Sequence, residues 1–207
     1  LAVIVVNYRT ADLTIECLAS LEAEIACIPD SQVLVVDNAS ADGSADRIEA
    51  AIRERGWGSW AELLRAPRNG GFAYGNNVGL EVLRSRGAKP EYIHLLNPDT
   101  VVMKGALQEL LAFLEGHLEV GIAGSRLETV EGGVHPNAFR FFSIASEFEA
   151  MVSLRVVSRL LARWTVAKPL SGGNEPVDWV CGASMLIRAR VFDDVPCLDE
   201  GYFLYYE

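Results

Sequence analysis

The stretch VLVVDNASADGS, Val33 to Ser44, shows the unit from which the fold can be predicted. Four apolar residues favour a buried strand, Asp37 ends that strand, and a helical pattern follows from Ser44 to Arg55. The same order recurs three times, as AVIVV before a helical pattern over 11–26, AELLRA before one over 74–86, and YIHLLN before one over 105–118. Such alternation is typical of an α/β fold with a mostly parallel sheet and helices on both faces.

The second half of the chain departs from this alternation. VGIAGSRL predicts a fifth strand, and the Gly, Pro and Asn residues of ETVEGGVHPNAFRFF favour an irregular or hairpin segment. A helical pattern then covers 143–164, VDWVCGASMLIR predicts strand structure, and GYFLYYE predicts one more element. Because no linker, repeat or low-complexity tract interrupts the chain, the sequence predicts a single domain over residues 1–207.

Composition excludes several classes of protein. The formal net charge of −10 argues against sequence-independent binding to nucleic acid, which requires clustered Lys and Arg. The four cysteines form no Cys-x-x-Cys pair, so we expect reduced, buried thiols in a cytoplasmic protein. No apolar run reaches the roughly 20 residues that cross a bilayer, and LAVIVV is too short for a signal-peptide core. Both ends are expected to be truncated. Leu1 is not an initiator Met, and the chain ends at Glu207, inside the aromatic segment GYFLYYE.

Polar residues follow each predicted strand. In an open α/β sheet, ligands bind beyond the carboxyl ends of the strands, so several such endings at one edge favour a ligand site. The runs are NYRT at 7–10, DNAS at 37–40, RNGGF at 68–72 and NPDT at 97–100. Structural alternatives exist: Asp42, Gly43 and Ser44 suit a turn and the start of a helix, and Asp99 or Thr100 suits a helix cap.

Asp99 is the first candidate for a metal ligand. The chain lacks G-x-G-x-x-G after its first predicted strand and lacks the P-loop pattern, which disfavours a dinucleotide dehydrogenase or a P-loop enzyme. A lone carboxylate after a strand instead suits a diphosphate held through Mg²⁺ or Mn²⁺, since these cations take oxygen ligands from one or two carboxylates and from phosphate.

With these runs in view, the sequence resembles the family 2 glycosyltransferases, inverting enzymes of the GT-A fold, and especially their rhamnosyltransferase-like branch. Matching stretches lie in family order along nearly the whole chain: VIVVNYRTADLTIECLASL, VLVVDNASADGS, RNGGFAYGNNVGL, LLNPDTVV, VDWVCGASMLIRARVF and LDEGYFLYYE. The resemblance implies a Rossmann-like GT-A fold, with a nucleotide-binding part over about 1–120 and an acceptor-side part over about 121–207.

The resemblance also implies roles for the strand-end residues. Tyr8 would lie against the nucleobase and Asp37 would hydrogen-bond it, which suits an aromatic face and a carboxylate acceptor. Asp99 matches the last carboxylate of the family's Asp-x-Asp motif and would bind the metal, whereas Asn97 replaces the first Asp and leaves one charged ligand. The implied donor-binding residues are Asn7, Tyr8, Asp37, Asn38, Ser40, Gly71, Phe72, Asn77, Asn97 and Asp99.

Residues nearer the C-terminus would serve the acceptor. Inversion requires a general base, which in the family is the Asp of a Glu-Asp pair at the end of a segment like FLYYE. This chain stops at Glu207, so we expect it to lack that base and to bind donor better than it turns over. Glu207 and Asp199 are the catalytic candidates, and Gly182, Ala183 and Glu200 the acceptor-side candidates. A solvated acidic loop and a glycine kink in a buried strand are the alternatives.

Two further features bear on partners and core. Arg155, Arg159 and Arg163 recur every four residues, so their helical face either meets anionic lipid or a lipid-linked acceptor, or is simply solvated. His94 lies within an apolar run and is predicted to be a hydrogen-bonded core residue.

The sequence therefore predicts a glycosyltransferase that uses dTDP-rhamnose or a UDP-hexose and a saccharide or lipid-linked acceptor, in bacterial polysaccharide or cell-wall synthesis. We expect it in the cytoplasm or at the inner face of the membrane, without a nucleic-acid partner. Two alternatives stay open. A sugar-phosphate nucleotidylyltransferase is disfavoured because NYRTADL has no glycine for a triphosphate loop, and a non-catalytic sugar-nucleotide-binding or scaffold domain is kept open by Asn97.

Overall fold

The computed structural model describes residues 1–152, 164–168 and 172–204. The chain divides into two compact units, one made of Leu1–Ala123 with Gly182–Glu207, the other of Gly124–Cys181. The first unit carries the parallel strands and the polar residues that follow them. Each unit is described by itself below.

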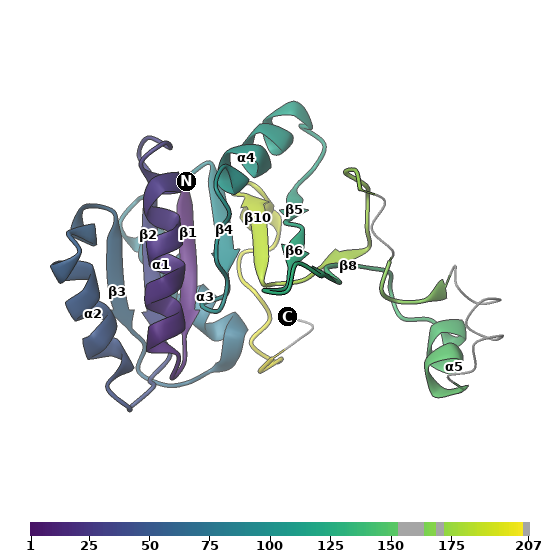
Figure 1. Ribbon diagram of the computed structural model, residues 1–207, viewed down its shortest axis with the longest axis horizontal. Coiled ribbons are helices and arrows are strands. Elements are labelled where there is room, and N and C mark those ends of the chain that lie inside the picture. The colour runs from purple at the N-terminus through teal and green to yellow at the C-terminus, as the bar shows by residue number, and fades with distance from the viewer. Residues whose placement is uncertain (153–163, 169–171, 205–207) are drawn as a thin grey trace. The chain divides into compact units, whose positions relative to one another are not determined.

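A six-stranded sheet in the order β3-β2-β1-β4-β10-β5 organises the first unit. Its strands are β1 Ala2–Asn7, β2 Gln32–Asp37, β3 Ala61–Arg65, β4 Tyr92–Leu96, β5 Ile122–Gly124 and β10 Ser184–Arg188. The first four pair in parallel, whereas β10 runs antiparallel to β4 (Figure 1). The register sets Asn7 opposite Asp37 and Asp37 opposite Arg65, so these strands end at the same level. The prediction of a mixed, mostly parallel sheet is confirmed.

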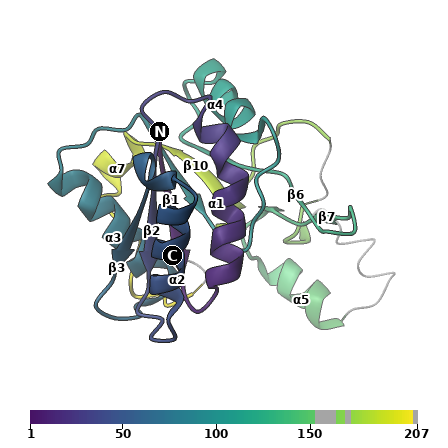
Figure 2. The ribbon, with the colours of Figure 1, turned by 60° about the vertical axis from the view of Figure 1, so that its left-hand side comes forward.

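Helices cover both faces of this sheet. They are α1 Ala11–Ile25, α2 Ser44–Glu54, α3 Gly71–Ser85, α4 Ala106–Gly116, the short α7 Val191–Asp194 and the 3-10 turn η1 Trp57–Ser59. On one face, Leu18 of α1 and Ile48 of α2 pack in the cluster that contains Val3. On the other, Leu80 of α3 packs with Ile4. Figure 2 shows α1 and α3 on opposite sides of the sheet. Because neighbouring residues of β1 are buried on opposite faces, the strand is an uninterrupted apolar run.

Helix α4 is held at both ends by side chains from outside it. The carboxylate of the buried residue Glu24 accepts hydrogen bonds from the Gly105 amide at 2.7 Å and from the Leu107 amide at 3.1 Å. At the other end, Nη2 of Arg188 donates to the Leu114 carbonyl at 2.6 Å. These contacts satisfy backbone groups that a helix leaves unpaired at its ends, and their charges complement the helix dipole.

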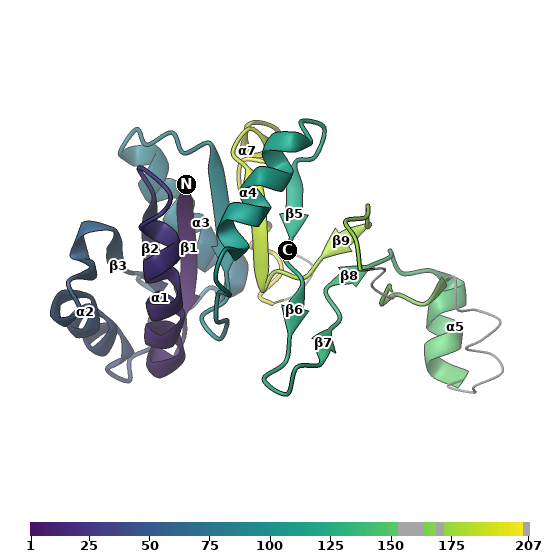
Figure 3. The ribbon, with the colours of Figure 1, turned by 45° about the horizontal axis from the view of Figure 1, so that its top comes forward.

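In its described residues, the second unit consists of short strands and the helix α5 (Figure 3). Antiparallel pairs join β6 Leu127–Glu128 with β7 Val134–His135, and β8 Ala138–Phe139 with β9 Trp179–Val180. Phe139 stacks on Trp179 with ring centres 4.0 Å apart. The segment 128–142, predicted as irregular or hairpin, contains β7 and most of the β6–β7 hairpin, while its strand β8 pairs with the distant strand β9. The helix predicted over 143–164 is confirmed for α5, Ile144–Val152, whereas Arg155, Arg159 and Arg163 lie outside the described residues.

Two predictions from the sequence require correction. Cys27 and Cys197 are exposed, so the expectation of buried thiols is wrong for them, although all four cysteines are free. Cys17 is buried, and burial raises the pKa of its thiol to about 12. The described part of GYFLYYE, residues 201–204, contains neither helix nor strand, so the further element predicted there is wrong for these residues. Cys27 follows the end of α1 and Cys197 follows the end of α7, so neither belongs to a helix or strand whose periodicity would determine its burial.

His94 lies in the core, as predicted. It is buried in β4, and its Nε2 lies 2.9 Å from Ser184 Oγ of the neighbouring strand β10. Its Nδ1 atom is buried without a hydrogen-bond partner among the described residues, so the predicted pairing holds for one ring nitrogen only. Burial lowers the pKa of the imidazole to about 4. No helix among the described residues combines the length and the apolar character that a membrane span requires.

Candidate functional site

Asn7, at the end of β1, is the centre of a buried hydrogen-bond network. Its Nδ2 donates to Asp37 Oδ1 at 2.7 Å and to Ser40 Oγ at 3.2 Å. Its Oδ1 accepts from Thr14 Oγ1 at 2.9 Å and from the Thr10 amide at 3.2 Å. The side chain is fully buried, so these partners satisfy it in place of water. One amide therefore ties the ends of two strands to the beginning of α1.

Asp37 and Ser40 close the loop after β2. The Ser40 hydroxyl donates to Asp37 Oδ1 at 2.6 Å, and the Ser40 amide donates to Asp37 Oδ2 at 3.1 Å. Ala39 and Ala41 have φ angles of 55° and 54°, a left-handed conformation that residues with a β-carbon seldom adopt. Arg9, with a φ of 59°, donates its amide to Ser40 Oγ at 2.9 Å. The network thus holds both loops in strained conformations, as is common at functional sites.

The neighbouring residues 42–44 form the turn and helix start that the structural alternative predicted. The Ser44 amide donates to Asp42 Oδ1 at 3.0 Å, and Gly43 is the N-cap of α2 with a φ of 86°. Hydrogen bonds from Ser44 lower the pKa of the exposed Asp42 carboxyl. The turn and the helix start are confirmed for these residues, with Gly43 as the N-cap and no side-chain cap hydrogen bond, while Asp37 and Ser40 belong to the strand-end network.

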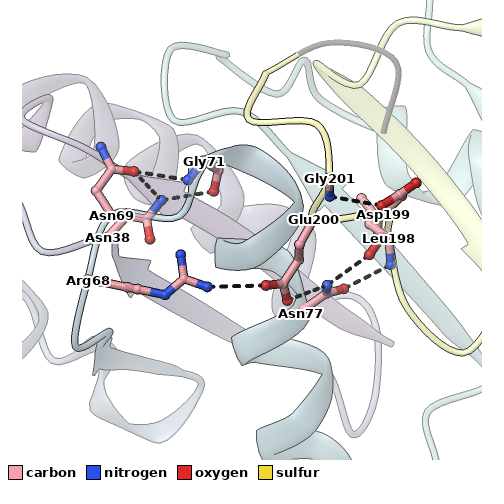
Figure 4. Close-up of polar contacts among 9 residues, drawn as sticks. All are labelled: Asn38, Arg68, Asn69, Gly71, Asn77, Leu198, Asp199, Glu200 and Gly201. Carbon is pink, nitrogen blue, oxygen red and sulfur yellow. Dashed lines mark hydrogen bonds and ion pairs between the residues drawn. The ribbon is translucent and has the colours of Figure 1, made fainter.

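Asn38 connects this network to the start of α3 (Figure 4). Its Nδ2 donates to Asn69 Oδ1 at 3.0 Å and to the Gly71 carbonyl at 2.9 Å. Asn69 Oδ1 also accepts the Gly71 amide at 3.0 Å, so it satisfies the first amide of α3 from outside the helix, whose N-cap is Gly70. Asn38 is buried, and its Oδ1 has no hydrogen-bond partner in the described part of the chain. This leftover acceptor lies directly beside the candidate site.

Asp99 is exposed beyond the end of β4 and does not cap a helix. Helix α4 begins at Ala106 with Gly105 as its N-cap, and Thr100 Oγ1 donates to the Asn97 carbonyl at 2.7 Å. The cap alternative for Asp99 and Thr100 is therefore wrong. Within the described ranges, Asp99 has neither a hydrogen bond nor an ion pair. The register of Val5 opposite Leu96 sets residues 97–99 beside the end of β1, where Asn7 lies.

The structure brings donor-side and acceptor-side candidates together. The Asn97 amide donates to the Ala183 carbonyl at 2.9 Å, which continues the pairing of β4 with β10. A β-carbon added to Gly182 would lie 3.2 Å from Cζ of Phe72, so the glycine permits the ring to approach the backbone. Tyr8, 40% exposed, stands at the end of β1 with the Arg9 guanidinium 5.0 Å from its ring centre.

Residues 198–204, here called the C-terminal strap, lie along the first turns of α3. Asn77 exchanges two hydrogen bonds with the backbone of Leu198 and donates to Glu200 Oε1 at 2.9 Å. The second oxygen of Glu200 lies 3.3 Å from Nη2 of Arg68 (Figure 4). Asp199 Oδ1 accepts the Gly201 amide at 2.8 Å. Glu207 lies outside the described residues.

The donor atoms at the strand ends fit a divalent cation only if a ligand completes its coordination. Asp99 offers an exposed carboxylate, and Asn97 stands two positions earlier. In the described ranges, no group of three or more His, Cys, Asp or Glu side chains is placed to hold a metal. One carboxylate with phosphate oxygens is a usual environment for Mg²⁺, whereas enclosure by the protein alone would require more ligands.

Several residues of the site were not selected from the sequence. Arg9, Thr10, Arg68 and Asn69 stand in the strand-end runs, and their polar character was a signal that could have identified them. Thr14 joins the network from within a helix, and its hydrogen bond to Asn7 depends on the packing of α1 against β1. No local pattern marks such a residue.

Solved structures identify the class of fold. The mannosyltransferase PcManGT from Pyrobaculum calidifontis, determined with GDP-Man and Mn²⁺, aligns with a TM-score of 0.59 and 19% identity over 96% of this chain and 47% of that one. S. aureus TarS with UDP aligns with a TM-score of 0.57 and 17% identity over 98% of this chain and 51% of that one. The fold is of the GT-A type, and this chain spans about half the length of either solved chain.

The sequence comparisons identify the family. The model described as glycosyl transferase family 2 matches residues 2–166, and the chain belongs to this family. N-acetylglucosaminyl-diphospho-decaprenol L-rhamnosyltransferase of Mycobacterium tuberculosis is 26% identical over 221 residues, which cover 100% of this chain and 67% of that protein. Rhamnosyltransferase WbbL of Escherichia coli is 27% identical over 141 residues, which cover 66% of this chain and 51% of that protein.

Proposed function

We propose that this chain transfers a sugar, with inversion, from a nucleoside diphosphate sugar to a saccharide or lipid-linked acceptor. The observation that carries the proposal is Asp99, an exposed carboxylate without a protein partner among the described residues, beside the buried network of Asn7 and Asp37. In a family 2 chain, a carboxylate left available at this sheet edge suits a metal-bound diphosphate. Rhamnose from dTDP-rhamnose is the first candidate donor sugar, and a hexose from a UDP-sugar is the second.

The donor would lie across the ends of β1, β2 and β4. The exposed ring of Tyr8 offers a face for a uracil or thymine base, because an aromatic ring is a stacking surface. Asp37 would meet the base, and its buried carboxylate is already held by Asn7 and Ser40, so it would keep a fixed orientation. Asn38 contributes one acceptor without a partner in the described part of the chain.

The diphosphate has few protein cations available to it. Arg68 is paired with Glu200, and the first amides of α3 are already bonded to Asn69 and Phe203. Asp99 and Asn97 would therefore hold Mg²⁺ or Mn²⁺ together with the diphosphate oxygens. Such a cation neutralises the charge that develops on a departing diphosphate. Asp99 needs no rearrangement to take this role, because it has no partner in the described residues to release.

The acceptor would approach from the side of β10. Ala183 is hydrogen-bonded to Asn97, and Gly182 lies beside the Phe72 ring. Inversion requires one carboxylate to remove the proton of the acceptor hydroxyl. Glu207 and Asp199 are the candidates for that base. Asp199 is exposed and has one oxygen bonded to the Gly201 amide, which orients the carboxylate and leaves its second oxygen available.

Contact with a lipid-linked acceptor is supported by apolar surface in the second unit. Five large apolar side chains between 141 and 151 are at least half exposed: Phe141, Phe142, Ile144, Phe148 and Met151. Apolar side chains on an amphipathic helix favour the interfacial region of a bilayer. We propose that the protein works at the inner face of the membrane in polysaccharide or cell-wall synthesis.

Calorimetric titration tests the donor assignment without requiring the sugar or the acceptor. UDP and dTDP are each titrated into the protein with Mn²⁺ and with EDTA. Binding in the micromolar range that requires Mn²⁺ supports the proposal, and the preferred nucleotide then selects the sugar nucleotides for transfer assays. Absence of binding for both nucleotides under both conditions would overturn it.

A further inference from the structure

Glu200 makes two side-chain contacts that a residue of a solvated loop would not be expected to make. Its two carboxylate oxygens reach different partners: Asn77 Nδ2 on α3 at 2.9 Å, and Arg68 Nη2 on the segment before α3 at 3.3 Å. The Arg68 guanidinium in turn lies 4.0 Å from the centre of the Tyr74 ring, a cation–π contact with the same helix. Glu200 thus joins the C-terminal strap to both sides of the α3 N-terminus.

Hydrogen bonds hold the strap against α3 at two separated points. Asn77 Nδ2 donates to the Leu198 carbonyl at 3.0 Å and the Leu198 amide donates to Asn77 Oδ1 at 2.9 Å, while the Phe72 amide donates to the Phe203 carbonyl at 3.0 Å. Five residues of helix rise about 7.5 Å, whereas five residues of extended chain reach roughly 17 Å. The turn in which Asp199 Oδ1 accepts the Gly201 amide takes up this excess length.

The energy of the Glu200 contacts is small for global stability. Side chains of Arg68 and Glu200 are 60% and 42% exposed, and ion pairs this exposed contribute little to folding. Their effect is local, because the seven-residue strap, which contains neither helix nor strand, has few other contacts to fix its position. Removal of Glu200 would therefore loosen the strap without unfolding the protein.

We propose that Glu200 is a positioning residue, which fixes the strap on α3 and so sets the position of the candidate base Asp199 within the strap. This inference rests on the proposed function, in which Asp199 is a candidate for the general base. The strap is continuous with the strand-end network, since Asn38 donates to the carbonyl of Gly71 and the next amide, that of Phe72, bonds the strap. In this proposal Glu200 acts through these contacts, in place of the acceptor-side role that the family resemblance implied for it.

Three variants separate this role from a general effect of surface charge. Glu200→Ala removes both contacts, and Glu200→Gln keeps an oxygen for Asn77 but loses the charge that faces Arg68. Glu62→Ala is the matched control, because Glu62 is 48% exposed and pairs with Arg86 at the opposite end of the same helix. None of the three is expected to change the midpoint of thermal unfolding by more than a few degrees.

Amide hydrogen exchange followed by NMR measures whether the strap is held. We expect Glu200→Ala to speed exchange at Leu198 and Phe72 about five- to tenfold, Glu200→Gln to do so less, and Glu62→Ala to have no effect. The Gly71 amide, bonded to Asn69, serves as an internal reference that should not change. Unchanged exchange at Leu198 and Phe72 in Glu200→Ala would overturn the assignment.

Transfer kinetics with the sugar nucleotide that corresponds to the bound diphosphate supply the second measurement. We expect Glu200→Ala to lower kcat about tenfold while KM for the sugar nucleotide stays within about threefold, since the donor contacts remain. Faster exchange with unchanged kcat would show a structural role only and overturn the proposal. A parallel rise in the dissociation constant of the nucleotide would place Glu200 in contact with donor and also overturn it. Failure of the unaltered protein to bind nucleotide would overturn the proposed function. The exchange rates need no ligand, so they test whether Glu200 holds the strap independently of that result.

Discussion

A β-carbon added to Gly71 would lie 1.9 Å from the carbonyl oxygen of Phe203, a distance at which no side chain can be accommodated. These two residues are 132 positions apart in the sequence, and the Phe72 amide that follows Gly71 donates to the same oxygen. Gly71 has a φ of 85°, so glycine is required here both by the backbone conformation and by the approach of the strap. Its absent side chain is what lets the C-terminal strap reach the start of α3.

Gly71→Ala is therefore predicted to release the strap. A left-handed φ costs an alanine about 1–2 kcal/mol in folding free energy, and the clash with Phe203 adds local displacement. Gly105→Ala is the matched control, because Gly105 has a φ of 84° but nothing within 4 Å of its would-be β-carbon. Urea unfolding should show a similar loss in both variants, whereas amide exchange at Phe72 should rise only in Gly71→Ala. Equal exchange in the two would show that the strap does not depend on Gly71.

Asp99→Asn is predicted to abolish the Mn²⁺-dependent part of UDP or dTDP binding and to leave thermal stability nearly unchanged. The carboxylate is exposed and makes no hydrogen bond or ion pair with the described residues, so its loss removes no internal contact. Calorimetric titration and differential scanning calorimetry measure the two effects. Asp193→Asn in α7 is the charge-matched control and should bind as the unaltered protein does. A large fall in the unfolding temperature of Asp99→Asn would return this residue to a structural role.

Asn7→Asp is predicted to destabilise the protein by about 2–4 kcal/mol at pH 7, because it places a second buried carboxylate beside Asp37 and removes the donor of a 2.7 Å hydrogen bond. The two neighbouring carboxyl groups would share a proton more readily as the pH falls. The deficit in unfolding free energy relative to the unaltered protein should therefore shrink toward pH 4. Urea unfolding at both pH values measures the deficit. A deficit independent of pH would contradict charge repulsion as its cause.

His94 is predicted to make stability depend on pH below neutrality. Burial lowers its pKa from 6.5 to about 4, so the unfolded chain takes up a proton first as the pH falls. The contribution of the neutral imidazole is complete above pH 6.5 and is lost as the pH falls through about 4. It amounts to about 2 kcal/mol between pH 7 and pH 5. Unfolding free energies of His94→Gln should lack this component, and the same slope in both proteins would contradict the prediction.

The alternation of strands and helices in the first unit could be predicted because both faces of each strand are covered. Burial on both sides makes β1 and β2 continuous apolar runs, and the helices that follow them have one apolar face. The period and the length of each apolar pattern therefore indicate the same type of element. The irregular or hairpin character of 128–142 was also predictable from Gly, Pro and Asn, whereas the pairing of β8 with β9 was not. Family 2 membership was indicated by the motifs quoted from the sequence and is confirmed by the family model.

The parts of the site that could not be predicted depend on contacts between distant segments. The Glu24 side chain of α1 accepts the Gly105 amide at the start of α4, and nothing in the sequence near Glu24 indicates a contact 81 positions later. The pairing of Asn77 with Leu198 has the same character. The residue roles at the site stay predictions, because the hydrogen bonds of Asn7, Asp37 and Ser40 show how these side chains are held and not what they bind.

The loop between β4 and α4 is fastened along its length. The Asn97 amide bonds Ala183, the Val102 amide bonds Ser20 Oγ at 2.9 Å, and the Gly105 amide bonds Glu24. Between these points Asp99 extends from a backbone whose conformational freedom was given up when the protein folded. A ligand that binds there has to immobilise little beyond one carboxylate side chain, at an entropic cost of roughly 0.5–1.5 kcal/mol, far below that of ordering a whole loop.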